Sequence, residues 1–257
     1  VLAIKQDMDD ALFLLGEVYF REKNFIKARE YFTACYDRNF NKCSFLLKLA
    51  EIAGHFSQTK IQEKILVEAT LDPKIEGKAL TELFKLKSKG EKREKVLLIG
   101  YKALVSLRRT IRVLQKNLKY QIAANNFVES KRITKEIRTT YEEVSEIYFQ
   151  CSRIVKSKRS ITLCIDRSIA FNPQNVKANF RKGILLNNES TKCIAYFKTC
   201  IENEWNHWEA RWHYLKLTEK EMTREEVISH LQTILECNPD HNEARIYLNK
   251  LVFSNPD

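Results

Sequence analysis

The sequence predicts an all-α protein, a solenoid of antiparallel helix pairs, and two observations carry that prediction. Apolar residues recur with a period of about 3.6 through nearly the whole chain, and no stretch shows the alternation of a strand. The 257 residues include only 6 Gly and 4 Pro, too few turn residues for a β-sandwich, a barrel or a propeller. Short polar joints divide the helical pattern into about six hairpins.

The hairpins follow one another from the amino terminus. A first amphipathic helix runs from Asp10 to a break at Asn24, and the next helix follows directly. The same design returns as helices over 42–54 and 59–69. Two helices joined by a turn of two or three residues form an αα-hairpin. Further along, 94–120 and 129–155 are expected to be long helices.

Three later joints share the dipeptide Asn-Pro, at Asn172-Pro173, Asn238-Pro239 and Asn255-Pro256. Proline cannot continue a helix but is tolerated in the first turn of the next one, and the residue before it disfavours the α conformation. Each joint therefore predicts that one helix ends and another begins. The first two prolines are 66 residues apart, about twice the ~34 residues of a helical-hairpin repeat.

The first hairpin resembles the tetratricopeptide repeat. That consensus has Leu-Gly and Tyr on its first helix and Ala, Phe and a small residue on its second. The matching residues here are Leu15, Gly16, Tyr19, Ala28, Phe32 and Cys35. Gly16 and Ala28 are expected to let the two helices approach closely, while Tyr19 and Phe32 fill the space between hairpins.

The resemblance extends to other parts of the chain. A second match begins at the Asn172 joint and includes Gly183, Cys193, Phe197 and Cys200, and a third spans 208–239. Weaker units occupy 42–72 and about 95–170. The family implies a right-handed superhelical solenoid, which would make one continuous array of this chain.

Composition divides that array into three parts. Residues 1–72 are expected to form amino-terminal repeat hairpins, 73–158 divergent basic hairpins, and 159–257 carboxy-terminal repeat hairpins. Because the sequence begins with Val1 rather than Met, we expect it to be a piece of a longer protein.

The net charge of +11 is concentrated in the middle of the chain. Residues 81–160 contain 20 Lys and Arg against 8 Asp and Glu, whereas the rest contains 24 against 25. A basic segment attracts acidic peptides, phosphates or nucleic acid. The alternatives are a solvated helical face, or charge that a partner neutralises within an assembly.

The basic residues of the first long helix fall on one face. Lys102, Arg109, Arg112 and Lys116 recur at steps of 7, 3 and 4. A second, apolar face of this helix is predicted to carry Leu98, Tyr101, Leu104, Ile111 and Leu118.

The sequence carries no catalytic signature. It has no glycine-rich phosphate loop, no Gly-x-Ser-x-Gly, no His-Glu-x-x-His and no histidines paired at i, i+4. Its seven cysteines include no Cys-x-x-Cys pair, which favours buried thiols in a reducing compartment, the nucleus or the cytoplasm. We therefore predict a binding protein without enzymatic activity, cofactor, metal or membrane association.

The segment 177–183 resembles the third-repeat motif of chaperone-adaptor tetratricopeptide domains. In those domains a Lys, with an Arg four residues on, holds the carboxylates at the carboxy terminus of a heat-shock chaperone. The matching residues are Lys177 and Arg181, and two cations one turn apart suit a carboxylate. The family's remaining clamp residues are missing, because 96–105 and 141–150 contain no Asn.

A second resemblance concerns the order of apolar motifs along the chain. The motifs lie at 11–15, 19–21, 43–47 and 148–151, ahead of the Asn172 joint. Together they resemble the amino-terminal half of the scaffold subunits of the anaphase-promoting complex, a ubiquitin ligase of the cell cycle. That family implies a homodimeric superhelix that holds other subunits.

Three functions follow, in order of preference. The first is a self-associating scaffold subunit of such an assembly, and the second is a co-chaperone adaptor that binds an acidic carboxy-terminal peptide. The third is an RNA- or phosphate-binding repeat protein that uses residues 84–159. Trp205, Trp208 and Trp212 are predicted to share one helical face, either as packing residues or as an exposed binding hot spot.

Overall fold

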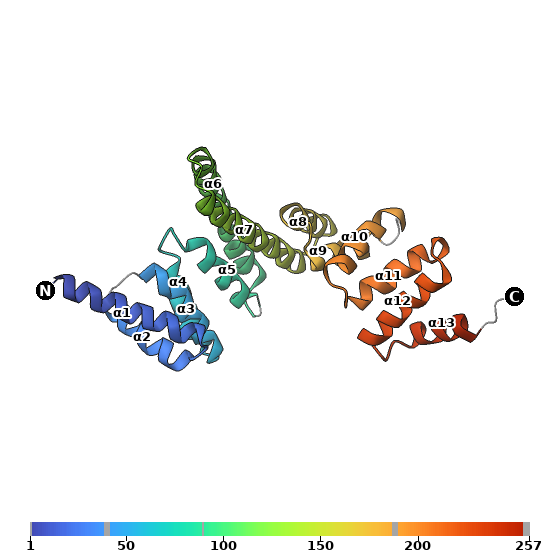
Figure 1. The fold of residues 1–257 in the computed structure, drawn as a ribbon, viewed down its shortest axis with the longest axis horizontal. Coiled ribbons are helices and arrows are strands. Elements are labelled where there is room, and N and C mark those ends of the chain that lie inside the picture. Colours follow the sequence, from blue (N-terminus) through green and yellow to red (C-terminus); the bar gives the residue numbers. More distant parts are fainter. Residues whose placement is uncertain (1, 39–41, 89, 187–189, 254–257) are drawn as a thin grey trace. The chain divides into compact units, whose positions relative to one another are not determined.

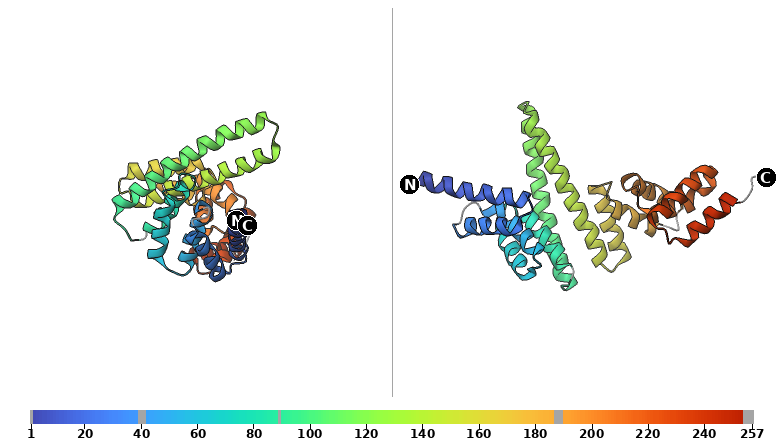
Figure 2. Two further views of the ribbon diagram at one scale, coloured as in Figure 1. Left: turned by 90° about the vertical axis from the view of Figure 1, so that its left-hand side faces the viewer. Right: turned by 60° about the horizontal axis from the view of Figure 1, so that its bottom comes forward.

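The computed structural model describes residues 2–38, 42–88, 90–186 and 190–253, and these contain helices and turns but no strand (Figures 1 and 2). The predicted all-α fold is confirmed. The helices are α1 (Leu2–Arg21), α2 (Phe25–Asp37), α3 (Lys42–His55), α4 (Thr59–Ala69), α5 (Glu76–Lys87), α6 (Arg93–Ala123), α7 (Phe127–Ile154), α8 (Lys158–Phe171), α9 (Val176–Leu185), α10 (Ser190–Asn203), α11 (Trp208–Thr218), the 3₁₀ turn η1 (Glu219–Glu221), α12 (Arg224–Cys237) and α13 (Asn242–Phe253).

The chain forms two compact units, unit 1 over Val1–Ile133 and unit 2 over Thr134–Asp257. The boundary between them falls inside α7, so each unit contains part of that helix. The three-part division by composition, with boundaries at 72 and 158, stays a prediction.

Unit 1 consists of helices that pair with their sequence neighbours, α1 with α2, α3 with α4 and α5 with α6 (Figure 1). Its main core joins the second helix of one hairpin to the first helix of the next. Phe32 of α2 lies 6.0 Å, ring centre to ring centre, from Phe45 of α3, and both side chains are fully buried. Burial of such aromatic surface is the main stabilising contribution to this packing.

Three turns of unit 1 close in the same way without glycine. Lys23, Ser57 and Asn125 adopt left-handed φ angles of 60°, 57° and 55°. The amide of the next residue then donates to a carbonyl five residues back, as Asn24 does to Tyr19 at 2.9 Å. This is the Schellman arrangement, in which glycine is the usual left-handed residue. The predicted break at Asn24 is confirmed, because α1 ends and α2 begins around this turn.

The close approach of paired helices predicted at Gly16 is confirmed, and unit 2 shows the same contact at Gly183. A Cβ atom added to Gly16 would lie 2.6 Å from Cε1 of Phe32, and one added to Gly183 would lie 2.7 Å from Cε1 of Phe197. Glycine is therefore what allows the phenylalanine ring to pack against the first helix. Leu15 does not join this contact, since 41% of it is exposed.

Unit 2 confirms two of the three Asn-Pro joints. Helix α8 ends just before Asn172 and α12 just before Asn238, and a new helix begins four residues after each. The Asn255-Pro256 joint lies outside the described residues. The long helices predicted over 94–120 and 129–155 correspond closely to α6 and α7.

Four of the described cysteines are buried: Cys35, Cys151, Cys193 and Cys200. Burial raises the pKa of both Cys151 and Cys200 to about 12, so these thiols stay protonated. Within the part of the chain that the structure describes, no helix combines the length and apolar character needed to cross a membrane.

Candidate binding surfaces

Helix α9 carries the predicted Lys177–Arg181 pair. Hydrogen bonds at the amino terminus of α9 hold this helix in place. The Asn175 side chain caps the helix by accepting from the Ala178 amide at 3.1 Å, and its Nδ2 donates to Ser145 Oγ of α7 at 2.8 Å. Asn179 Nδ2 donates to the Pro173 carbonyl at 2.8 Å. Capping of this kind contributes about 1 kcal/mol and fixes where the helix begins.

Arg181 is a half-buried cation without an anionic partner among the described residues. Its Nη1 donates to Ser152 Oγ at 3.2 Å, and the Ser152 hydroxyl itself donates to the Phe149 carbonyl at 2.6 Å. Burial, followed by the charge of Arg153, lowers the pKa of Arg181. A guanidinium that is partly desolvated beside another cation is stabilised by any anion that reaches it.

The two lysines of the motif, Lys177 and Lys182, differ in exposure and in their ion pairs. Lys182 is committed internally, because its Nζ lies 2.6 Å from Asp166 Oδ1 and only 10% of its side chain is exposed. Lys177 keeps 65% of its side chain exposed, and its Nζ is 3.9 Å from Glu146 Oε1, at the limit of an ion pair. Lys177 and Arg181 are therefore less engaged with internal carboxylates than Lys182 is, and their binding role stays a prediction.

Sequence analysis missed Ser152 and Arg153, which lie beside Arg181 at the end of α7. Their position depends on how α7 packs in unit 2, and α7 lacks the Gly and Ala positions that would have set its repeat register. To predict this contact, the sequence of α7 would have to be aligned with that of α9 as successive helices of a repeat. The sequence of α7 has no consensus residue that fixes this alignment.

The four predicted cations of α6, Lys102, Arg109, Arg112 and Lys116, are all exposed and belong to unit 1. Toward the end of the helix, an open hollow of about 500 Å³ is lined by Arg112, Gln115, Lys116, Leu118, Lys119 and Ile122. The α6 cations belong to unit 1 and the Lys177–Arg181 pair belongs to unit 2, so each is a candidate surface of its own unit.

The predicted apolar face of α6 is partly wrong. Leu104 and Ile111 are buried, but Leu98 and Tyr101 are 55% and 65% exposed and share the exposed face with the cations. The buried stripe runs through Val96, Gly100, Ala103 and Leu107 together with Leu104 and Ile111, and Leu98 and Tyr101 lie outside it. Tyr120, 69% exposed, lies on the same face as the cations near the end of α6.

The predicted tryptophan face is also partly wrong. Trp205 precedes α11, is 65% exposed, and receives a hydrogen bond on its carbonyl from Arg211 Nη2 at 3.0 Å. Trp208 and Trp212 are half-buried against the core of α11–α13 and lie 5.4 and 4.6 Å from the His241 ring. Trp208 and Trp212 are therefore packing residues. Trp205 does not share their helical face, because α11 begins only at Trp208.

No group of three or more His, Cys, Asp or Glu side chains with the geometry of a metal site occurs in the described ranges. The candidate surfaces are instead cationic and apolar, so their chemistry is that of recognition by charge and hydrophobic contact.

The repeated antiparallel helix pairs define a helical-repeat protein. Residues 9–42, which include most of α1 and all of α2, match the family model described as "Tetratricopeptide repeat". The structure described as "Assembly Chaperone of RpL4 (Acl4) (Residues 1-338)" is similar to this chain with a TM-score of 0.60 and 12% identity, over 95% of each chain. The first hairpin thus matches a tetratricopeptide repeat, as the sequence predicts, and the similar structure shows a shared helical-repeat fold over most of the chain.

Two further similar structures have lower TM-scores. Pseudomonas aeruginosa pilF aligns at 0.44 with 16% identity, over 81% of this chain and 97% of that one. The "TPR2AB-domain:pHSP90-complex of yeast Sti1" aligns at 0.33 with 15% identity, over 96% and 98%. A search of curated protein sequences found no match.

Proposed function

We propose that this chain is a non-enzymatic protein-interaction scaffold that binds an acidic segment of a partner protein at α9. The observation that carries the proposal is Arg181, a half-buried guanidinium whose described contacts are a serine hydroxyl and a neighbouring cation rather than a carboxylate. A carboxylate placed between Arg181 and Lys177 would form charge-assisted hydrogen bonds where the cost of burying the cation has already been met by folding.

The test is a titration of the whole chain with a fluorescent peptide that ends in acidic residues and a free carboxylate. Lys177→Ala should weaken binding by about 1.5–3 kcal/mol, because one hydrogen bond to a charged group is lost. Lys198→Ala is the matched control: Lys198 is 60% exposed and 3.9 Å from Glu202, much as Lys177 is from Glu146. Equal affinity of the two variants would discard the site at α9.

The finer assignment, a self-associating subunit of an assembly such as the anaphase-promoting complex, rests on the resemblance of the apolar motifs. It implies a nuclear or cytoplasmic protein. Sedimentation of the purified chain should then show a dimer, and a strict monomer at tens of micromolar would count heavily against it.

A second candidate function is binding of RNA or another polyanion by α6. The observation in its favour is that Tyr101 and Tyr120 are exposed on the same helix face as the cations. Aromatic rings beside cations provide stacking platforms for single-stranded nucleic acid. Affinity for single-stranded RNA should fall steeply with salt, and absence of binding at low salt would end this alternative.

A further inference from the structure

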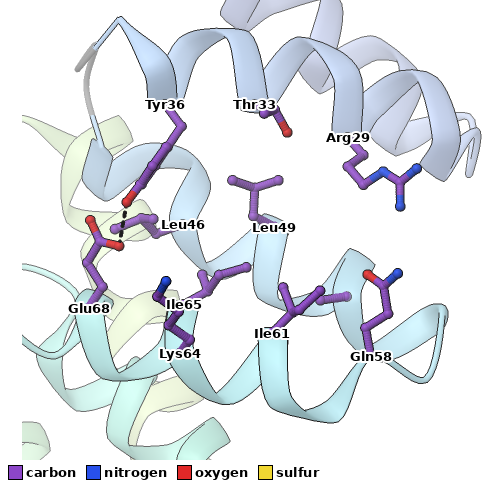
Figure 3. A pocket seen from close by; sticks show the side chains of 11 residues that line it. Arg29, Thr33, Tyr36, Leu46, Leu49, Gln58, Ile61, Lys64, Ile65 and Glu68 are labelled. Carbon is purple, nitrogen blue, oxygen red and sulfur yellow. Dashed lines mark hydrogen bonds between the residues drawn. The ribbon is translucent and has the colours of Figure 1, made fainter.

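An open apolar groove of about 380 Å³ lies in unit 1 between α2 and α4, with α3 as its floor (Figure 3). Leu46, Leu49 and Ala53 of α3 form the base and are almost fully buried. Ile61 and Ile65 of α4 form one wall, and 51% of Ile61 is exposed. The volume lies in the range of about 300–1,000 Å³ that is usual for binding pockets.

The groove-lining residues repeat at helical steps on all three helices. On α2 they are Arg29, Thr33 and Tyr36, on α3 Leu46, Leu49 and Ala53, and on α4 Ile61, Lys64, Ile65 and Glu68. Each row spans two helical turns, roughly 10 Å at 1.5 Å per residue. Figure 3 shows the rows of α2 and α4 on opposite sides of the α3 leucines. A cavity of this form matches a helix with apolar residues at i, i+3 or i+4, and i+7.

The charges on the rim are unequal. The Tyr36 hydroxyl donates to Glu68 Oε2 at 2.8 Å, which raises the pKa of Tyr36 and closes one end of the groove. Arg29 lies over the Phe56 ring, with its Cζ 5.2 Å from the ring centre. Neither Arg29 nor Lys64 is within ion-pair distance of an acidic side chain of the described chain. The groove therefore offers an apolar floor, two cations without an ion-pair partner, and one carboxylate, Glu68, that accepts a hydrogen bond from Tyr36.

We propose that this groove binds an acidic amphipathic helix of a partner protein. The apolar face of that helix would cover Leu46, Leu49 and Ile61, and its carboxylates would lie over Arg29 and Lys64. The helical period of the rows argues for a helix, and the rim cations argue for an acidic one. The groove belongs to unit 1 and the Lys177–Arg181 pair to unit 2, so the two candidate sites share no residue.

The experiment is fluorescence anisotropy of the whole chain with two labelled helical peptides. One has three leucines spaced by four and three residues with glutamates beside them, and the other has lysines in place of those glutamates. The glutamate peptide should bind at least tenfold more tightly, a difference of about 1.4 kcal/mol. Reversal of the rim charges by Arg29→Glu with Lys64→Glu should invert that preference.

Ile61→Glu should weaken the glutamate peptide at least tenfold, because it places a carboxylate in the apolar wall. Val67→Glu is the matched control, since Val67 is on the same helix and 49% exposed but does not line the groove. If Ile61→Glu loses helical circular dichroism, Thr33→Trp provides a second test, because the indole fills the groove from an exposed position.

The proposal fails if wild-type protein binds neither peptide at millimolar concentration or binds both equally. It also fails if Val67→Glu weakens binding as much as Ile61→Glu does. Lys177→Ala should bind the glutamate peptide like the wild type, so the failure of this site and that of the α9 site can be told apart.

Discussion

The hairpins α1–α2 in unit 1 and α9–α10 in unit 2 bury the same pattern but present different surfaces. Helix α2 buries Ala28, Phe32 and Cys35, and α10 buries Cys193, Phe197 and Cys200, all at i, i+4 and i+7 and all with no exposed area. A glycine of the first helix lies against the phenylalanine in each case. The buried pattern therefore fixes the pairing of the helices and is the same in both units.

The residues that differ are the ones that do not take part in this packing. In unit 1, Arg29 and Thr33 point into an apolar groove, whereas in unit 2 the exposed Lys177 and the half-buried Arg181 form a cationic site. The comparison teaches that one hairpin skeleton supports two recognition chemistries, because recognition uses positions outside the shared Gly–Phe packing.

The largest expected effect comes from removing the shared phenylalanines. Phe32→Ala and Phe197→Ala should each cost about 3–5 kcal/mol, since each leaves a cavity in a filled core. Denaturant unfolding followed by circular dichroism measures this cost. A loss below about 1 kcal/mol in either unit would show that the two cores are not equivalent.

Alkylation of Cys35 and Cys200 shows which unit opens. Burial is the main cause that raises the pKa of both thiols, so both should be unreactive at about pH 8 while folded. Phe32→Ala should speed alkylation of Cys35 and Phe197→Ala that of Cys200. If each variant speeds both reactions equally, the units unfold together and the division into two is wrong for folding.

Smaller effects are expected at the glycines. Gly16→Ala and Gly183→Ala should destabilise by up to about 2 kcal/mol, because overpacking against a buried ring exceeds the gain in helix propensity. Gly54→Ala is the control: a Cβ there would lie 2.8 Å from Nε2 of Gln62, the movable end of a flexible side chain. It should stabilise by up to about 1 kcal/mol. Thermal unfolding of the three variants tests this order. Equal shifts in their unfolding temperatures would contradict the packing argument.

Acid should lower the stability of unit 2 more than that of unit 1, with a smaller effect than the substitutions above. Burial is the main cause that lowers the pKa of His213 and His230, which both belong to unit 2. The unfolded chain then binds more protons than the folded one, so this contribution is complete above pH 6.5 and is lost as the pH falls toward the lowered values. Denaturant unfolding at pH 7.5 and 5.5, followed by the fluorescence of the tryptophans, which all lie in unit 2, should show this loss, and His230→Gln should reduce it.

Local sequence signals predicted most helix boundaries. They could not predict which helix faces are buried, because packing in the fold decides that. Asn-Pro joints end helices by backbone sterics, and the Gly16–Phe32 pair follows from the repeat consensus. Both features could therefore be predicted from the sequence. Leu98 and Tyr101 were misplaced because α6 has apolar residues on more than one face, and packing in the fold, including contact with α5, decides which face is buried. The groove beside Ile61 was missed for a similar reason, since it needs three helices that come together only in the fold.

The smallest expected effect concerns the glycine-free turns of unit 1. Lys23→Gly should stabilise the protein by about 1 kcal/mol, because a side chain with Cβ is strained at its left-handed φ of 60° while glycine is not. Asn125→Gly should gain less, since asparagine tolerates this conformation. Denaturant midpoints of the two variants test the order. A larger gain at Asn125 would show that the turn residues are not chosen by backbone strain, and that Lys23 owes its place to a contact outside the turn.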